Sequence, residues 1–130
     1  MLFSISSFAQ QVEVTVNIRG LISSKGKVFI AVFSNPEGYP GNADAAIAKS
    51  IIEIKDNKAT TTMALPPGTY AWAVFHDENN NQILDKNIFG YPKEKFGFSN
   101  NPKINFGAPT FNECSLAVNT TTKTITINLN

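Results

Sequence analysis

The patterned part of the chain begins with a run in which apolar and polar residues alternate. From Val12 to Ile18, valine or isoleucine occupies every second position, and a polar residue occupies each position between. The same period of two returns from Lys123 to Leu129, where threonine and asparagine alternate with isoleucine and leucine. In an extended chain this period places the apolar side chains on one face. Both segments therefore predict strands with one buried face.

Further strands follow from composition and from the turn signals that separate them. Lys27 to Ser34 is apolar on both faces, which is typical of a central strand. Asp56-Asn57 predicts a hairpin turn that joins two partner strands, because Asn and Asp tolerate a left-handed backbone. Pro66-Pro67-Gly68 predicts a rigid turn, because each Pro fixes φ and Gly tolerates positive φ. Ala43 to Lys49 predicts one or two helical turns, with Asn42 as their cap. The other predicted strands are Ile51 to Lys55, Lys58 to Leu65, Thr69 to His76 and Ser115 to Val118.

About seven short strands with turns between them predict an all-β fold. The expected architecture is an antiparallel two-sheet sandwich, immunoglobulin-like or transthyretin-like, with one long aromatic loop. A length of 130 residues suits one domain. Hydrophobic residues make up 42% and charged residues 16%, which excludes a disordered tail and an integral membrane segment in the mature chain. A net charge of +1 argues against nucleic-acid binding, which needs a basic face.

The first residues have the features of a secretory signal. An apolar run is followed by the small-x-small sequence Ser7-Phe8-Ala9 and then by the polar Gln10. We expect residues 1–10 to be the remnant of a signal peptide. Residues 11–130 would then be a single exported domain in the periplasm, at the cell surface or outside the cell. The alternative is that the first residues form a short N-terminal strand.

The most informative stretch of the chain directly follows the strand that ends at His76. Oxygen-bearing side chains occupy its relative positions one, three, five and nine, at Asp77, Asn79, Asn81 and Asp85. A short loop surrounds Ca²⁺ with this spacing, and Ile83 at position seven would add its backbone carbonyl. The sequence therefore predicts a Ca²⁺ site with a structural role.

Two positions depart from the usual calcium loop. Gln82 stands at position six, where glycine permits a sharp turn, and Ile88 stands at position twelve, where an acidic residue normally binds. The dissociation constant should then be on the order of 10⁻⁴ to 10⁻³ M, unless a distant carboxylate such as Glu94 or Glu113 contributes. The alternative is an Asn-rich turn without metal, because Asn and Asp hydrogen-bond the local backbone.

Residues from about 87 to 112 show no strand period but are rich in aromatic rings. A loop of this length in a small domain is usually functional or packed on itself. One interpretation is a flap whose rings cover an open end of the sandwich. The other is a groove for a protein or glycan, in which rings stack and amides form hydrogen bonds. The candidate ligand-binding residues are Tyr91, Phe96, Phe98, Asn100 and Asn101.

No catalytic motif stands out in the chain. There is no nucleophile elbow, no His-x-x-x-His pair and no phosphate loop. A hydrolase would have to use His76, the only histidine, with a nearby carboxylate. Adjacent strand residues point to opposite faces, so His76 and Asp77 would not converge. Cys114, the only cysteine, is expected to be an apolar core residue. We therefore expect a protein that is not an enzyme.

Several groups of residues are distinctive when taken together. They are Leu65-Pro66-Pro67-Gly68-Thr69-Tyr70, Phe75-His76-Asp77-Glu78-Asn79, Phe89-Gly90-Tyr91-Pro92-Lys93-Glu94 and Phe96-Gly97-Phe98-Ser99-Asn100-Asn101. In these groups the chain resembles an exported bacterial family known as domain of unknown function 2141. The likeness extends from about Val12 to Leu129. The loop typical of that family is Asp-Glu-Asn-Gly-Asn-Gly, and here Asn80 and Gln82 replace its glycines.

The Pro-Pro-Gly-Thr-Tyr turn and the Asp-Asn-Asn loop also resemble those of transthyretin-like and collagen-adhesin B-type sandwiches, some of which hold calcium at a similar loop. These resemblances imply a sandwich fold and assign no activity. We expect an exported, non-enzymatic module, stabilised by Ca²⁺, that presents its aromatic loop to a protein or glycan. The alternative is a purely structural component of the cell envelope that pairs through strand edges.

Overall fold

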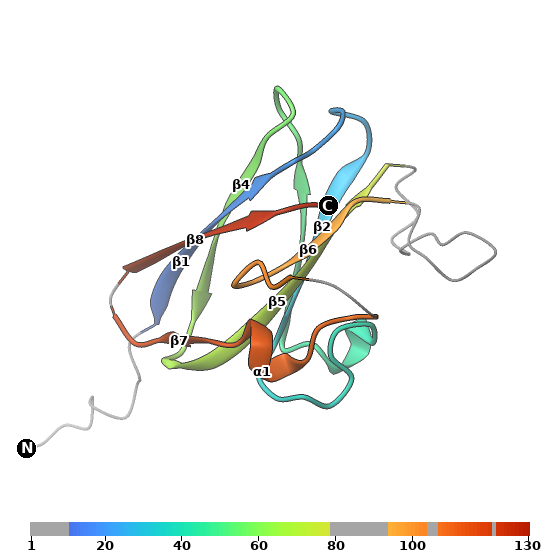
Figure 1. The fold of residues 1–130 in the computed structure, drawn as a ribbon. Coiled ribbons are helices and arrows are strands. Elements are labelled where there is room, and N and C mark those ends of the chain that lie inside the picture. Colours follow the sequence, from blue (N-terminus) through green and yellow to red (C-terminus); the bar gives the residue numbers. More distant parts are fainter. Residues whose placement is uncertain (1–10, 79–93, 104–106, 121) are drawn as a thin grey trace, which may run out of the picture.

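Two β-sheets face each other across an apolar core (Figure 1). The structure is a computed structural model, and it describes residues 11–78, 94–103, 107–120 and 122–130. The all-β sandwich predicted from the sequence is confirmed. Residues 1–10 lie outside the described residues, so export stays a prediction. Within the described residues, no helix has the length and apolar content needed to cross a membrane.

The smaller sheet has three strands in the order β4-β1-β8. They are β1 (Val12–Arg19), β4 (Ala59–Leu65) and β8 (Thr122–Asn128). β1 runs antiparallel to β4 but parallel to β8, so this one strand pair departs from the antiparallel pairing expected from the sequence. The reason is where the chain enters β8. β7 ends beside Gly68, at the same end of the sandwich where Val12 pairs with Leu65, and β8 therefore starts at the same end as β1.

The larger sheet has five strands, all paired antiparallel. Four of them follow the order β3-β2-β5-β6, and β7 pairs with the beginning of β5. Their bounds are β2 (Lys27–Phe33), β3 (Ala48–Glu53), β5 (Gly68–Asp77), β6 (Phe96–Phe98) and β7 (Leu116–Val118). β2 is central, as its apolar composition predicted, because β3 and β5 pair with its two edges.

The predicted turn at Asp56-Asn57 is present but does not join two strands of one sheet. Both residues have positive φ, 54° and 60°, and Lys55 and Lys58 exchange backbone hydrogen bonds of 2.9 and 3.0 Å. Beyond these bonds the chain separates, since β3 pairs with β2 and β4 pairs with β1. The turn therefore carries the chain from one sheet to the other.

The predicted helical turns are shorter than expected. A 3₁₀ helix covers Ala43–Ala45, and the Asn42 side chain accepts a hydrogen bond from the Asp44 backbone N–H at 3.1 Å, as predicted for a cap. The helix ends there because the Ile47 N–H donates to the Val32 carbonyl oxygen at 2.8 Å. Pairing with β2 thus replaces helical hydrogen bonds, and Ala48 and Lys49 belong to β3.

The segment predicted as one long aromatic loop contains regular structure. Phe96 and Phe98 belong to β6, which pairs with β5, and Phe111–Cys114 forms the short helix α1. Thr110 and Glu113 cap α1 reciprocally in a capping box. The lack of a strand period had concealed β6, because a strand of three residues is too short to show one.

A second apolar cluster covers the outer face of the larger sheet. We call it the outer cluster, and its buried members are Ala31, Phe33, Ala71, Phe98, Phe111 and Cys114. The ring of Tyr39 meets Phe33 and Phe111 edge-on, with centroid distances of 5.1 and 5.8 Å. The core position expected for Cys114 is confirmed, since its thiol is buried in this cluster. The larger sheet is therefore covered by apolar side chains on both faces.

Candidate functional site

The predicted metal ligands divide between described and undescribed parts of the chain. Asp77 is the last residue of β5, and its side chain is only 1% exposed. Asn79, Asn81, Ile83 and Asp85 lie outside the described residues, and so does Tyr91. The structure therefore describes one of the predicted metal ligands, Asp77, at the end of β5.

A second carboxylate lies at the same end of the sheet. Glu94 is 6% exposed, and its Oε2 accepts a hydrogen bond from the Glu78 backbone N–H at 2.9 Å. This contact brings together the two ends of the segment 79–93. Glu113 lies elsewhere, because its carboxylate caps α1 by accepting from the Thr110 N–H at 2.8 Å. Of the two distant carboxylates considered from the sequence, Glu94 is the one beside the loop.

The turn before β2 packs closely against the backbone of Asp77 and Glu78. Gly26 has a φ of +67°, and a Cβ there would lie 2.1 Å from the Asp77 carbonyl oxygen. Only glycine fits a left-handed position so close to another backbone. The imidazole Nε2 of His76 donates to the Lys25 carbonyl oxygen at 2.6 Å, which ties the same turn to β5. These two contacts fix the turn before β2 against the end of β5.

A lysine stands beside Asp77 in the strand register. Lys27 pairs with Asp77 on one side and with Glu53 on the other. Its ammonium group contacts Glu53 at 2.5 Å, and both side chains of that pair are at least partly exposed. In the described residues, no group of three or more His, Cys, Asp or Glu side chains is placed to hold a metal ion. The two buried carboxylates are hard oxygen donors that suit Ca²⁺, and any further ligands would have to come from elsewhere.

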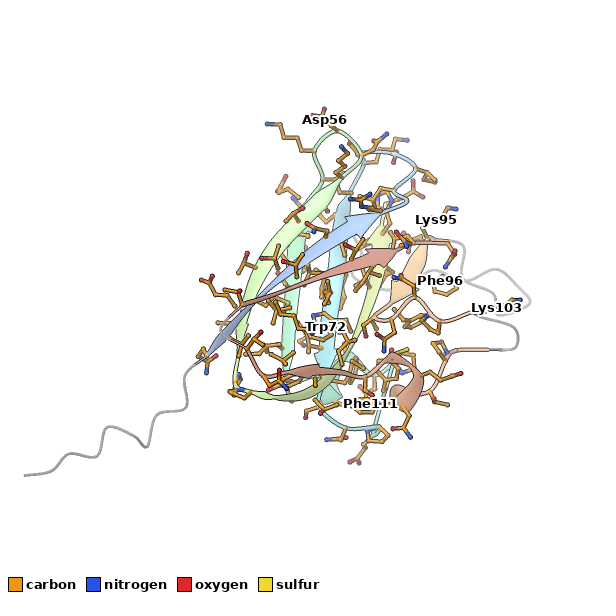
Figure 2. The ribbon with its side chains drawn as sticks, turned by 60° about the vertical axis from the view of Figure 1, so that its left-hand side comes forward. Asp56, Trp72, Lys95, Phe96, Lys103 and Phe111 are labelled. Carbon is orange, nitrogen blue, oxygen red and sulfur yellow. The ribbon has the colours of Figure 1, made fainter. Side chains whose placement is uncertain are left out.

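The structure places the predicted ring contacts in the packing of the fold. Phe98 is 7% exposed and belongs to the outer cluster, so it does not offer a ring face for stacking. Phe96 is half-buried and meets Phe98 edge-on at a centroid distance of 5.7 Å. The burial of Phe98 agrees with the alternative in which the rings pack on the sandwich, and ligand binding by this residue stays a prediction. Phe96 keeps an exposed part at the margin of the molecule where β6 begins (Figure 2).

The two predicted amide contacts are already used within the protein. Asn100 donates from Nδ2 to the carbonyl oxygens of Glu113 and Ser115, at 3.3 and 2.9 Å. Asn101 donates from Nδ2 to the Thr126 carbonyl oxygen at 2.9 Å, and its Oδ1 accepts from the Asn128 N–H at 2.8 Å. Both asparagines have positive φ, 68° and 44°. Their arrangement indicates a structural role, in which they fasten the turn after β6 to neighbouring segments.

One exposed feature was missed from the sequence. Ile51, Phe29, Phe75 and Phe96 lie directly opposite one another across β3, β2, β5 and β6. We call these four residues the aromatic row. Ile51 is 44% exposed and the three rings are half-buried. Phe29 and Phe75 stack with a centroid distance of 5.2 Å and an interplanar angle of 25°. Only the register reveals the row, since its members come from four separate segments.

The arrangement around His76 gives no support to a hydrolytic site. His76 is fully buried, and within the described residues its Nδ1 has no hydrogen-bond partner. Asp77 follows it on an alternating strand and so points to the opposite face. Burial also raises the pKa of the Cys114 thiol, while a hydrogen bond from Tyr39 lowers it to a smaller extent. A thiol with a raised pKa is a poor nucleophile.

The sequence profile of a bacterial family matches residues 16–126, from within β1 to within β8. The family is described as an uncharacterized protein conserved in bacteria, domain of unknown function 2141. The chain belongs to this family. The matched range contains most of both sheets, the buried carboxylates of Asp77 and Glu94 and the aromatic row, so these features lie within the family domain. No curated protein and no solved structure matches the chain. The more distant likeness to transthyretin-like sandwiches stays a prediction.

Proposed function

We propose that this member of the family is an exported, non-enzymatic binding module whose fold is stabilised by Ca²⁺. The ion would bind at the acidic end, which we define as the carboxylates of Asp77 and Glu94. One observation carries the proposal: the Asp77 and Glu94 carboxylates are both buried where the segment 79–93 leaves and rejoins the sandwich. Oxygen ligands from that segment would complete the coordination.

The chemistry of this end suits a weak structural calcium site. Ca²⁺ takes six to eight oxygen ligands, and carboxylates are its preferred charged donors. Asp77 and Glu94 supply two of them from positions fixed by a strand and by a hydrogen bond to the Glu78 backbone. A site with few charged ligands binds in the extracellular range, with a dissociation constant on the order of 10⁻⁴ to 10⁻³ M. Such a site would be filled outside a cell.

The aromatic row supports a role in binding a partner. It forms an apolar strip on the outer face of the larger sheet, next to the exposed ion pair of Lys27 and Glu53. Phe29 and Phe75 each use one ring face on the other, which leaves less ring surface for stacking a sugar. Of the two partner classes, protein and glycan, this geometry favours a protein with apolar side chains.

The proposed calcium role is tested by thermal unfolding of the whole chain. Unfolding in EDTA is compared with unfolding in about 5 mM CaCl₂ and, as a control, MgCl₂. Ligand binding to the folded state should add about 1–2 kcal/mol at the dissociation constant given above. A domain of this size should then gain several degrees in Tm with calcium. Equal Tm values in EDTA and calcium would leave the acidic end as a metal-free polar turn.

The binding role has its own test, which does not depend on calcium. Replacing Phe75 by Ser would remove the centre of the aromatic row while leaving the inner core intact. In a pull-down from the native envelope fraction, the Phe75→Ser variant should no longer bind a protein partner that the wild type binds. Phe111→Ala is the control for a loss of packing outside the aromatic row. If both variants retain the same proteins as the wild type, the aromatic row has no binding role.

A further inference from the structure

The strand β3 lies at an open edge of the larger sheet. β2 pairs with one of its edges, and in the part of the chain that the structure describes no strand pairs with the other. Its residues alternate strictly in burial: Ala48, Ser50 and Ile52 face inward, whereas Lys49, Ile51 and Glu53 are exposed. An open edge presents backbone N–H and C=O groups to which another strand can pair, and an exposed apolar residue favours that pairing.

The exposed residues of β3 are arranged so that the strand complements itself. In an antiparallel pair of two copies centred on Ile51, each Ile51 faces the Ile51 of the other copy. Lys49 of one copy then faces Glu53 of the other, and the reverse pair forms by symmetry. Residues directly opposite in an antiparallel pair lie on the same face, so both ion pairs and the isoleucine contact form on the outer face.

The register also keeps the inner faces compatible. Ser50 faces Ile52 of the other copy, and both are among the half-buried residues of the strand. A shift by one residue would oppose inward and outward side chains and would lose this match. The two-fold axis would run perpendicular to the sheet, which makes the contact isologous. The aromatic rows of the two copies would then form one continuous strip across the joint.

We propose that two copies of this chain associate through antiparallel pairing of their β3 edges, centred on Ile51 and flanked by Lys49–Glu53 ion pairs. We infer that the strand paired with this edge belongs to a second copy, because the two-fold axis places Lys49 of each copy opposite Glu53 of the other. This inference rests on the edge alone and is independent of calcium binding. Contacts through one strand bury a small area, so association in the micromolar range is expected.

Charge reversal tests the proposed register. Sedimentation of the full chain from about 5 to 500 μM should show a concentration-dependent dimer, consistent with a small interface. Lys49→Glu places two negative charges opposite each other at both ends of the joint. Like charges directly opposite destabilise a strand pair, so the dimer dissociation constant should rise about tenfold or more. Glu53→Lys should have the same effect with positive charges.

The two variants should associate with each other. A copy with Glu at both positions faces a copy with Lys at both positions, so an equimolar mixture should form heterodimers about as well as the wild type. The double variant Lys49→Glu/Glu53→Lys should also dimerise. Because Glu53→Lys loses the ion pair with Lys27, circular dichroism must show that each variant is folded.

A matched control has the same change of charge at the other side of the sheet. Lys103 is exposed and follows β6 (Figure 2), so Lys103→Glu should leave the dimer unchanged. The proposal is overturned if the wild type stays monomeric over the whole concentration range. It is also overturned if Lys49→Glu and Lys103→Glu act alike, or if the mixture associates no better than either variant alone.

Discussion

Trp72 and Ser99 exchange hydrogen bonds just beyond the end of β6. The Trp72 N–H donates to the Ser99 hydroxyl oxygen at 2.9 Å, and the Ser99 N–H donates to the Trp72 carbonyl oxygen at 3.1 Å. The same hydroxyl donates to the Cys114 carbonyl oxygen at 2.5 Å. A side chain thus continues the ladder between β5 and β6 after the strand has ended, and it connects that ladder to α1.

This relationship predicts that Ser99→Ala destabilises the fold. The change leaves a buried donor at Trp72 and a buried acceptor at Cys114 without the hydroxyl. An unsatisfied buried polar group costs about 1–3 kcal/mol, so the free energy of unfolding should fall by at least that amount in a urea titration. Ser115→Ala is the control, because its hydroxyl bonds the Asn112 carbonyl in an exposed position. Equal losses for both variants would contradict the role given to Ser99.

The acidic end predicts a selective loss of the calcium response. Glu94→Gln keeps an oxygen that can accept from the Glu78 N–H but removes the negative charge. The rise in Tm on adding calcium should therefore disappear or shrink by more than half, while the variant stays folded. Asp77→Asn should act in the same way. Glu113→Gln, which can still cap α1, should respond to calcium like the wild type. A full response in Glu94→Gln would remove that carboxylate from the site.

Gly97 lies where β6 contacts β8, and a larger residue at this position should destabilise the fold. A Cβ there would lie 2.7 Å from the Asn128 carbonyl oxygen and 2.9 Å from Cγ2 of Ile127. Gly97→Ala must therefore displace β8, and overpacking of this kind costs about 1–3 kcal/mol. Gly41→Ala is the matched control, since a Cβ at Gly41 has no atom within 4 Å. Denaturant midpoints of the two variants measure the difference. Similar midpoints would contradict the prediction, because they would show that the added methyl group at Gly97 is accommodated without a loss of free energy of unfolding.

Tyr39 predicts a loss of stability in alkali. Burial, followed by a hydrogen bond with Cys114, raises the pKa of the Tyr39 phenol above its ordinary value of 10.0. Above that ordinary value the unfolded chain releases the proton while the folded chain keeps it, so unfolding becomes easier as pH rises. The stabilisation is fully present below the unfolded pKa and is lost as pH rises toward the folded pKa.

The variant Tyr39→Phe isolates this effect. It should be less stable than the wild type at neutral pH, by about 0.5–1.5 kcal/mol, because it lacks the hydrogen bond to the Trp72 carbonyl. Its stability should then fall less steeply between about pH 9 and pH 11, since one of the shifted groups is gone. Urea titrations across this range measure the slopes. Parallel curves for variant and wild type would show that Tyr39 does not titrate with unfolding.

Phe98 and Phe96 should differ sharply when truncated. Phe98 is buried in the outer cluster, so Phe98→Ala should cost about 3–5 kcal/mol, as other buried Phe truncations do. Phe96 is half-buried on the same strand, and Phe96→Ala should cost clearly less. Unfolding of both variants gives the comparison within one element. Equal costs would mean that Phe96 is packed as tightly as Phe98.

The sequence alone predicted most of the strands and the turns between them. The period of two from Val12 to Ile18 determined which face of β1 is buried, because alternation places side chains on opposite faces whatever the partner strand is. The turn at Asp56-Asn57 was equally local, since only a few residue types tolerate positive φ. Glu94 could be identified from the sequence as a carboxylate near this loop, but its hydrogen bond with the Glu78 backbone N–H could not be predicted.

The tertiary structure decided which strands pair and what each face meets. The three residues of β6 form a strand because they pair with β5. β8 runs parallel to β1 because β7 ends at the end of the sandwich where β1 begins. The contact between Glu94 and Glu78, the aromatic row and the open edge of β3 all depend on register between distant segments. Local sequence carries no information on such register, because pairing energies come from contacts that form only when the segments meet.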